Sequence, residues 1–192
     1  MADTPLIVPD FPVPASVAER ARRVRLALFD VDGVLTDGRV ILGADDEHKA
    51  FDIKDGHGIK LLQRHSVEIG LITGRRSRAV ERRAAELGIR HVYQGVGEKL
   101  PVYRQLLKDL RLTPEQTAYA GDDVVDLPIL LQVGLAITVQ DGHALVKQHV
   151  HWVTPNAGGR GAVRQFAELV LHAQGNYSAE MERYLSGADE RA

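Results

Sequence analysis

The sequence predicts an α/β fold in which helices cover both faces of a doubly wound, Rossmann-like parallel sheet. Short apolar runs of strand length recur along the 192 residues, and most are followed by a segment with helical periodicity. This alternation is typical of βαβ units. Charged motifs follow the ends of several strands, which is where open α/β sheets bind their ligands.

The elements follow from this pattern in chain order. Strands are expected at 25–29, 67–72, 89–93, 117–120, 134–138 and 151–153. Helices are expected at about 57–64, 77–87, 98–110, 126–132, 142–148 and 161–173. One insert, residues 38–53, is read as a β-hairpin with strands at 39–42 and 49–53 and a turn at 43–46.

The domain organisation is expected to be simple. Residues 1–23 are read as an N-terminal arm that is rich in proline up to residue 14. Residues 24–176 are expected to form one domain, because 44% hydrophobic content supports a sizeable core. Residues 177–192 are read as a polar C-terminal tail.

Composition narrows the class of protein. A net charge of -2 argues against a general nucleic-acid binder. No apolar stretch approaches membrane-spanning length, and the N-terminus lacks the features of a signal peptide. The absence of cysteine excludes disulfides and is compatible with a cytoplasmic location. We therefore expect a cytoplasmic protein with neither a membrane nor a nucleic-acid partner.

The strongest motif is Asp30-Val31-Asp32-Gly33-Val34-Leu35-Thr36, directly after the first strand. In a regular strand Asp30 and Asp32 point to the same side, and Gly33 lets the chain turn while a ligand approaches. Two like charges this close are costly unless a cation or a substrate lies between them. A helix cap or turn would be the ordinary explanation for a single Asp-Gly pair, so the motif gains its weight from those that follow.

Three further motifs also lie where a strand stops. Thr73-Gly74-Arg75 offers a hydroxyl and backbone amides suited to phosphate, and Lys99 stands near the start of a helix. Gly121-Asp122-Asp123 follows the fourth strand, with Asp126 three residues on. Each motif is weak alone, but their order and their common place at strand ends make the set specific.

In these four motifs the chain resembles the haloacid dehalogenase superfamily of phosphotransferases. The resemblance implies that Asp30 is a nucleophile and Asp32 a general acid/base. It also implies Mg²⁺ held by the carboxylates of Asp30 and Asp122 and by the backbone carbonyl of Asp32, with Thr73 and Lys99 holding phosphoryl oxygens. Asp123 and Asp126 are read as groups that orient Lys99 or a metal-bound water.

The spacing leaves no room for a cap domain over the site, because only 43 positions separate Asp30 from Thr73 and 26 separate Thr73 from Lys99. The hairpin insert has three consecutive apolar residues at 40–42 and is expected to need a partner surface. A second copy of the chain is the expected partner. The alternative is a hairpin folded back on its own domain.

The segments Phe51–Ile59, Tyr93-Gln94-Gly95 and Gly158–Arg164 narrow the resemblance to the capless phosphatases of 3-deoxy-D-manno-octulosonate 8-phosphate, over about residues 24–176. These relatives imply an acid-sugar phosphate substrate, a homotetramer and a role in lipopolysaccharide biosynthesis. The implied substrate contacts are Asp32, Asp52, Ile53, Lys54, Asp55, Gly56, Lys60, Thr73, Gly74, Arg75, Arg83 and Lys99. A cationic region apart from the phosphate site suits the sugar carboxylate, and Arg160 is either a substrate contact or a turn residue.

Two alternatives to this function stay open on the sequence. The same chemistry can act on a nine-carbon sialic or ketodeoxynonulosonate 9-phosphate. The domain can also be a non-catalytic oligomerisation module, but this alternative fits less well with four intact motifs.

Overall fold

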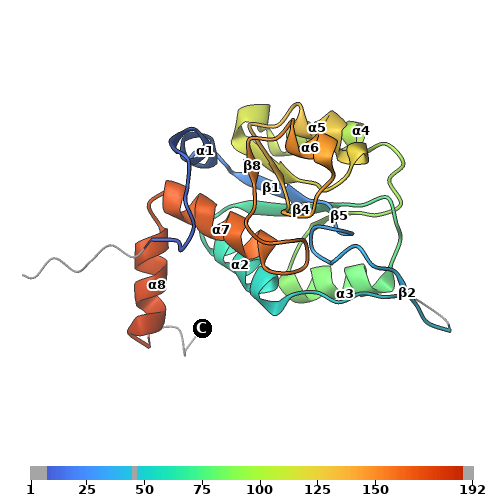
Figure 1. The fold of residues 1–192 in the computed structure, drawn as a ribbon, viewed down its shortest axis with the longest axis horizontal. Coiled ribbons are helices and arrows are strands. Elements are labelled where there is room, and N and C mark those ends of the chain that lie inside the picture. Colours follow the sequence, from blue (N-terminus) through green and yellow to red (C-terminus); the bar gives the residue numbers. More distant parts are fainter. Residues whose placement is uncertain (1–7, 45–46, 188–192) are drawn as a thin grey trace, which may run out of the picture.

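A computed structural model of the chain describes residues 8–44 and 47–187 (Figure 1). Its centre is a six-stranded sheet in the order β5-β4-β1-β6-β7-β8, and every neighbouring pair of strands is parallel. The strands are β1 Leu26–Phe29, β4 Glu68–Ile72, β5 His91–Tyr93, β6 Thr117–Ala120, β7 Leu135–Thr138 and β8 Trp152–Val153. The predicted doubly wound parallel sheet is confirmed, and the described residues contain no cap domain.

Helices cover both faces of the sheet (Figure 1). One face is covered by α2 Ile53–Arg64, α3 Arg78–Leu87 and α7 Ala162–Ala173, and the other by α4 Lys99–Leu110, α5 Leu127–Leu130 and α6 Ala144–Lys147. Two short 3₁₀ turns, η1 Pro114–Gln116 and η2 Val124–Asp126, flank β6. The buried apolar side chains form one cluster on each side of the sheet. β1 lies between β4 and β6, and all the strands are parallel. The loops that carry the four motifs therefore converge at the carboxyl ends of the strands.

Two helices occur in segments that were expected to be an arm and a tail. Helix α1 spans Ala15–Ala21 and buries Val17 and Ala21 beside α7. Helix α8 spans Tyr177–Leu185 and buries Tyr177 and Glu180. The sequence analysis did not predict these two helices, each of which buries only two residues and is stabilised mainly by packing on the domain.

Helix α2 begins at Ile53, four residues before the start that was expected at about residue 57. The Asp52 side chain accepts a hydrogen bond from the backbone N–H of Lys54, which caps the first turn. Gly56 and Gly58 have low helix propensity and gave the segment the composition of a loop. In the structure both glycines allow close packing, since a Cβ on Gly58 would lie 3.1 Å from Ala167 Cβ of α7.

The insert is a short antiparallel hairpin of β2 Ile41–Leu42 and β3 Glu47–His48, which extends away from the sheet (Figure 1). The second strand was expected at 49–53 but ends at His48, and part of the expected turn, residues 45–46, lies outside the described residues. Val40, Ile41 and Leu42 are exposed, with Leu42 at 82%. The hairpin therefore does not bury these side chains on its own domain.

In the part of the chain that the structure describes, no helix combines the length and the apolar character that a membrane span needs.

Candidate active site

Asp30 lies at the carboxyl end of β1 and is nearly buried. Its Oδ1 accepts a hydrogen bond from the backbone N–H of Val31 at 2.7 Å, and its Oδ2 lies 2.9 Å from Lys99 Nζ. Burial raises the pKa of Asp30 to about 6 together with the nearby charge of Asp126, although Lys99 acts in the opposite direction. The carboxylate is thus fixed by two donors at the mouth of the sheet.

Lys99 is held at the start of α4 by three partners. Its Nζ lies 2.9 Å from Asp30, 2.7 Å from Asp126 Oδ1 and 3.3 Å from the Tyr119 hydroxyl. Burial lowers the pKa of Lys99, but the charges of Asp30 and Asp126 outweigh burial and raise it overall. Lys99 therefore stays an ammonium group and supplies fixed positive charge beside Asp30.

Asp126 is completely buried and accepts hydrogen bonds at both oxygens. Tyr119 Oη and Lys99 Nζ donate to Oδ1 at 2.6 and 2.7 Å, and the backbone N–H groups of Asp122 and Asp123 donate to Oδ2 at 3.1 and 3.3 Å. Four donors use the whole acceptor capacity of a carboxylate. Asp126 orients Lys99, whereas the exposed Asp123 instead caps η2.

A cluster of three carboxylates fits a divalent cation. Single oxygens of Asp30, Asp122 and Asp126 lie within 4.8 Å of one another. Burial raises the pKa of Asp122 to about 7, with further contributions from the charges of Asp30 and Asp126. A hard cation such as Mg²⁺ relieves this repulsion and prefers oxygen ligands. Because Asp126 is already saturated with donors, Asp30 and Asp122 are the side chains suited to bind the ion.

Gly33 makes this arrangement possible. Its φ is +86°, a left-handed conformation that favours glycine, and a Cβ at this position would lie 2.1 Å from Asp122 Oδ2. Any side chain here would collide with the carboxylate of Asp122 or displace it. The first and fourth motifs are thus in contact through the glycine of the first.

A cavity of about 450 Å³ joins all four motifs. Its lining includes Asp30, Asp32, Gly38, Thr73, Gly74, Arg75, Val96, Gly97, Lys99, Asp122, Asp123 and Val125. Thr73 is buried at the end of β4, and its hydroxyl accepts a hydrogen bond from the backbone N–H of Arg75 at 3.3 Å. A polyanionic group placed here meets the Lys99 ammonium on one side and the loop after Thr73 on another.

One residue of this region was missed by the sequence analysis. The Lys49 side chain is 1% exposed, and its ammonium group pairs with the carboxylate of Asp32 and with Glu47 Oε1 at 3.2 Å. Glu47 also pairs with Arg75. The sequence alone does not show which residues a lysine in a predicted hairpin strand contacts. The pairing of the strands and the conformation of the hairpin determine the position of its ammonium group.

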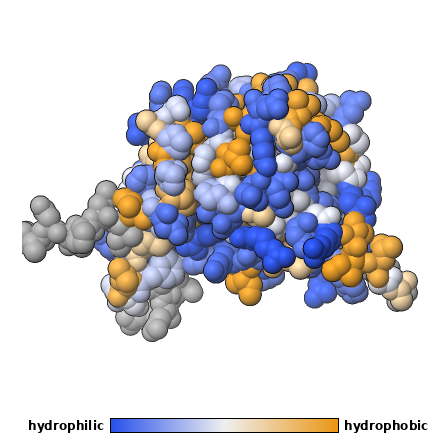
Figure 2. Space-filling model, viewed as in Figure 1, coloured by the Kyte–Doolittle hydropathy of each residue, from blue (hydrophilic) through white to orange (hydrophobic). Residues whose placement is uncertain are grey.

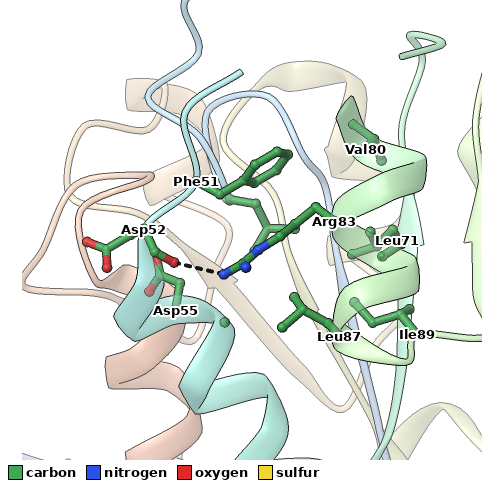
Figure 3. Close-up of a pocket in the computed structure, with 11 residues that line it drawn as sticks. Phe51, Asp52, Asp55, Leu71, Val80, Arg83, Leu87 and Ile89 are labelled. Carbon is green, nitrogen blue, oxygen red and sulfur yellow. Dashed lines mark hydrogen bonds between the residues drawn. The ribbon is translucent and has the colours of Figure 1, made fainter. Parts of the chain in front are cut away.

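Arg83 of α3 reaches toward the first turn of α2 (Figure 3). Its guanidinium donates to the Asp52 carbonyl at 3.4 Å and lies 6.0 Å from the centre of the Phe51 ring. A Cβ on Gly56 would lie 2.1 Å from Arg83 Nη2, so the glycine leaves room for this side chain. Its other surroundings in the pocket are largely apolar, from Leu71, Val80, Leu87 and Ile89 (Figure 3).

Asp55 belongs to the first turn of α2, and its buried side chain contacts the N-terminus of α7. Its carboxylate accepts hydrogen bonds from the backbone N–H groups of Arg164 at 2.7 Å and Gly161 at 3.3 Å. Burial raises the pKa of Asp55 to about 6. In this chain Asp55 holds α2 to α7 and is not among the residues that line the Asp30 cavity.

The remaining predicted contacts lie outside that cavity in the single chain. Ile53 is 82% exposed, and Lys54 borders a separate groove with Arg160 and Asp52. Lys60 is exposed near Gly88, and Arg160 is exposed with its guanidinium 3.8 Å from Asp37. The fold thus brings the four motifs together but leaves part of the predicted sugar contacts on the outer surface.

Known proteins are similar to this chain in sequence and in fold. Residues 90–166 match the family model described as haloacid dehalogenase-like hydrolase. The 3-deoxy-D-manno-octulosonate 8-phosphate phosphatase of Yersinia pestis is 47% identical over 164 residues, which cover 85% of this chain and 88% of that protein. The corresponding phosphatase of Escherichia coli K12 is 46% identical over 165 residues, with the same two coverages.

Solved structures of such phosphatases have the same fold as this chain. The crystal structure of the Yersinia pestis phosphatase superposes with a TM-score of 0.87 at 45% identity, covering 91% of this chain and 96% of that one. The Moraxella catarrhalis phosphatase, solved with a magnesium ion, a phosphate ion and a KDO molecule, gives a TM-score of 0.86 at 38% identity, covering 88% of this chain and 97% of that one. The chain therefore belongs to the 3-deoxy-D-manno-octulosonate 8-phosphate phosphatase family of haloacid dehalogenase-like hydrolases.

Proposed function

We propose that this protein hydrolyses 3-deoxy-D-manno-octulosonate 8-phosphate to the free sugar acid and phosphate, as a Mg²⁺-dependent phosphoric monoester hydrolase of lipopolysaccharide biosynthesis. The observation that carries the proposal is the single cavity that joins Asp30, Asp32, Thr73, Lys99 and Asp122. The identity of 46–47% with phosphatases of this substrate, over 85% of the chain, supports the choice of sugar.

Asp30 is the proposed nucleophile. One of its carboxylate oxygens forms a bond to phosphorus as the bond to the sugar oxygen breaks, which gives an aspartyl phosphate. The Val31 amide and Lys99 hold the carboxylate in one orientation. Mg²⁺, bound by Asp30, Asp122 and the backbone carbonyl of Asp32, would screen the negative charge of the phosphoryl group. Lys99 and Thr73 would hold the remaining phosphoryl oxygens.

Asp32 is the proposed general acid and base. It protonates the leaving sugar oxygen in the first step and, as a carboxylate, takes a proton from the water that hydrolyses the aspartyl phosphate in the second. Its side chain is 20% exposed and lines the cavity. This position, beside the nucleophile and open to the cavity, suits proton transfer with substrate.

The sugar portion needs its own binding groups. Arg75 lines the cavity, and Arg83 lies on the next helix with its guanidinium at the start of α2. We propose that these cations and Lys60 receive the sugar carboxylate, while the segment 52–56 contacts other parts of the sugar. Since Ile53, Lys54 and Lys60 lie on the outer surface of the single chain, we propose that they contribute to the site of a neighbouring subunit.

A homotetramer in the cytoplasm completes the proposal. The hydrophobic surface around the projecting hairpin is visible at the lower right of Figure 2, and it comes from Val40, Ile41 and Leu42. Burial of such side chains stabilises an interface by roughly 1.5–3 kcal/mol for each one that is fully buried. Charged residues at Val40 and Leu42 together should give a smaller assembly by sedimentation. The variant should keep turnover of a small phosphate ester and lose efficiency on the sugar phosphate.

The function is tested with a panel of eight- and nine-carbon acid-sugar phosphates and two enzymes, wild type and Asp30→Asn. We expect the highest kcat/KM on the octulosonate phosphate and no turnover by Asp30→Asn, with an unchanged circular dichroism spectrum. A clear preference for a nine-carbon substrate would instead assign the sialic or ketodeoxynonulosonate reaction. Absence of turnover on every ester with Mg²⁺ would favour a non-catalytic module.

A further inference from the structure

The hairpin insert places a buried cation against the proposed acid/base residue. Lys49 follows β3, and its side chain is almost wholly removed from solvent. An ammonium group is costly to bury unless it is paired, and here it pairs with Asp32 Oδ1 and with Glu47 Oε1. The Glu47 side chain is itself 9% exposed. The contact is therefore a built feature of the fold and not a solvated surface ion pair.

The lysine is the third member of a row of alternating charges. Arg75 pairs with Glu47, Glu47 with Lys49, and Lys49 with Asp32. Arg75 stands just after β4 and Glu47 in β3, so the row spans the second motif, the hairpin and the first motif. Held between two carboxylates, the Lys49 ammonium has little freedom to move.

We propose that Lys49 is a positioning residue that orients Asp32 for proton transfer. The proposal rests on the acid/base role of Asp32 in the proposed function. With Oδ1 engaged by Lys49, Oδ2 is the oxygen that meets the leaving oxygen of the substrate and later the attacking water. Lys49 touches neither reacting atom in this assignment and acts only through Asp32.

The consequence depends on the leaving group. The nucleophile Asp30 has its own supports in Val31 and Lys99, so loss of Lys49 leaves the attack on phosphorus intact. A sugar alkoxide needs a proton as it leaves, whereas 4-nitrophenolate leaves without one. Hydrolysis of the aspartyl phosphate needs the base with either substrate. A misplaced Asp32 therefore slows both steps on the sugar phosphate but only the second step on 4-nitrophenyl phosphate.

The experiment compares Lys49→Met, Lys49→Arg, Asp32→Asn and the double variant Lys49→Met/Asp32→Asn, all with Mg²⁺. Lys108→Met removes an exposed lysine of α4 and serves as the control. We expect Lys49→Met to lower kcat on the octulosonate phosphate by about 10- to 100-fold, less than the roughly 10²–10⁴-fold that an acid/base group supplies, with KM changed less than about threefold. Lys49→Arg should recover most of the loss.

Two readouts separate positioning from a general loss of structure. Rapid-quench measurements on 4-nitrophenyl phosphate should show a burst of nitrophenol in Lys49→Met, because the first step stays fast while the second slows. The double variant should be no slower than Asp32→Asn, since residues that act through one group are not additive. Equal losses in the burst and the steady state, or additive losses in the double variant, would overturn the assignment.

The same experiments distinguish an error in the proposed substrate from an error in the proposed role of Lys49. A wild-type enzyme without activity on the octulosonate phosphate would overturn the proposed function. The burst and the double variant on 4-nitrophenyl phosphate would still decide the role of Lys49.

Discussion

Replacement of Asp126 by Asn tests whether Asp126 holds Lys99 in place beside Asp30. The carboxylate receives four donors, two at each oxygen. Asn keeps one acceptor oxygen and places an NH₂ group where the other oxygen stood. Two donors then lose their acceptor, and the buried Lys99 loses one of its two carboxylate partners.

The magnitude follows from these contacts. Hydrogen bonds to a charged group contribute about 1.5–3 kcal/mol each, and removal of one partner from a buried ion pair costs about 3–5 kcal/mol. The two figures describe the same contacts and are not added. Loss of the Asp126 charge relieves repulsion with Asp30 and Asp122, whose pKa values it raises. We expect the free energy of unfolding to fall by about 3–5 kcal/mol, and Tm to fall by roughly 6–20 °C for a domain of this size.

Urea unfolding followed by circular dichroism measures this loss, at one protein concentration because self-association shifts apparent stability. Asp109→Asn is the matched control, since this exposed carboxylate of α4 accepts a hydrogen bond from the Gln105 side chain one turn earlier and does not contact Lys99. The control should change the free energy of unfolding by less than about 0.5 kcal/mol. A change of under about 1 kcal/mol for Asp126→Asn would refute the view that Asp126 secures Lys99.

Three further outcomes are expected. Apparent Mg²⁺ affinity by calorimetry should rise with pH through about 6 and 7, because the ion displaces protons from Asp30 and Asp122; an affinity independent of pH would contradict this. Gly56→Ala should keep Tm but displace Arg83 and raise KM for the sugar phosphate severalfold, and an unchanged KM would separate Arg83 from substrate. Burial and the charge of Arg20 lower the pKa of His151 below 6.5, and its Nδ1 accepts the Ala136 N–H. As the pH falls, His151 is therefore protonated at a higher pH in the unfolded chain than in the folded protein. The free energy of unfolding should keep its full value above pH 6.5 and decrease below it. In His151→Gln the free energy of unfolding should depend less on pH.

The sequence by itself determined the sheet and the place of the chemistry. Strands of a parallel sheet covered on both faces are mostly apolar, and all six were predicted within two residues of their ends. Parallel strands carry their following loops to one edge, and the four motifs therefore converge whatever the details of the helices. Asp30, Thr73, Lys99 and Asp122 were predicted on this ground, and the structure brings them to one cavity.

Only the tertiary structure decided which contacts these residues make. The capping of α7 by Asp55 and the pairing of Lys49 with Asp32 join residues that lie 109 and 17 positions apart in the chain. Local patterns carry no information on such contacts. Helices α1 and α8 were missed for the same reason, because they bury few residues and owe their stability to the surface beneath them. Periodicity records how much of an element is buried, whereas the partner of a buried charge is set by how the elements pack.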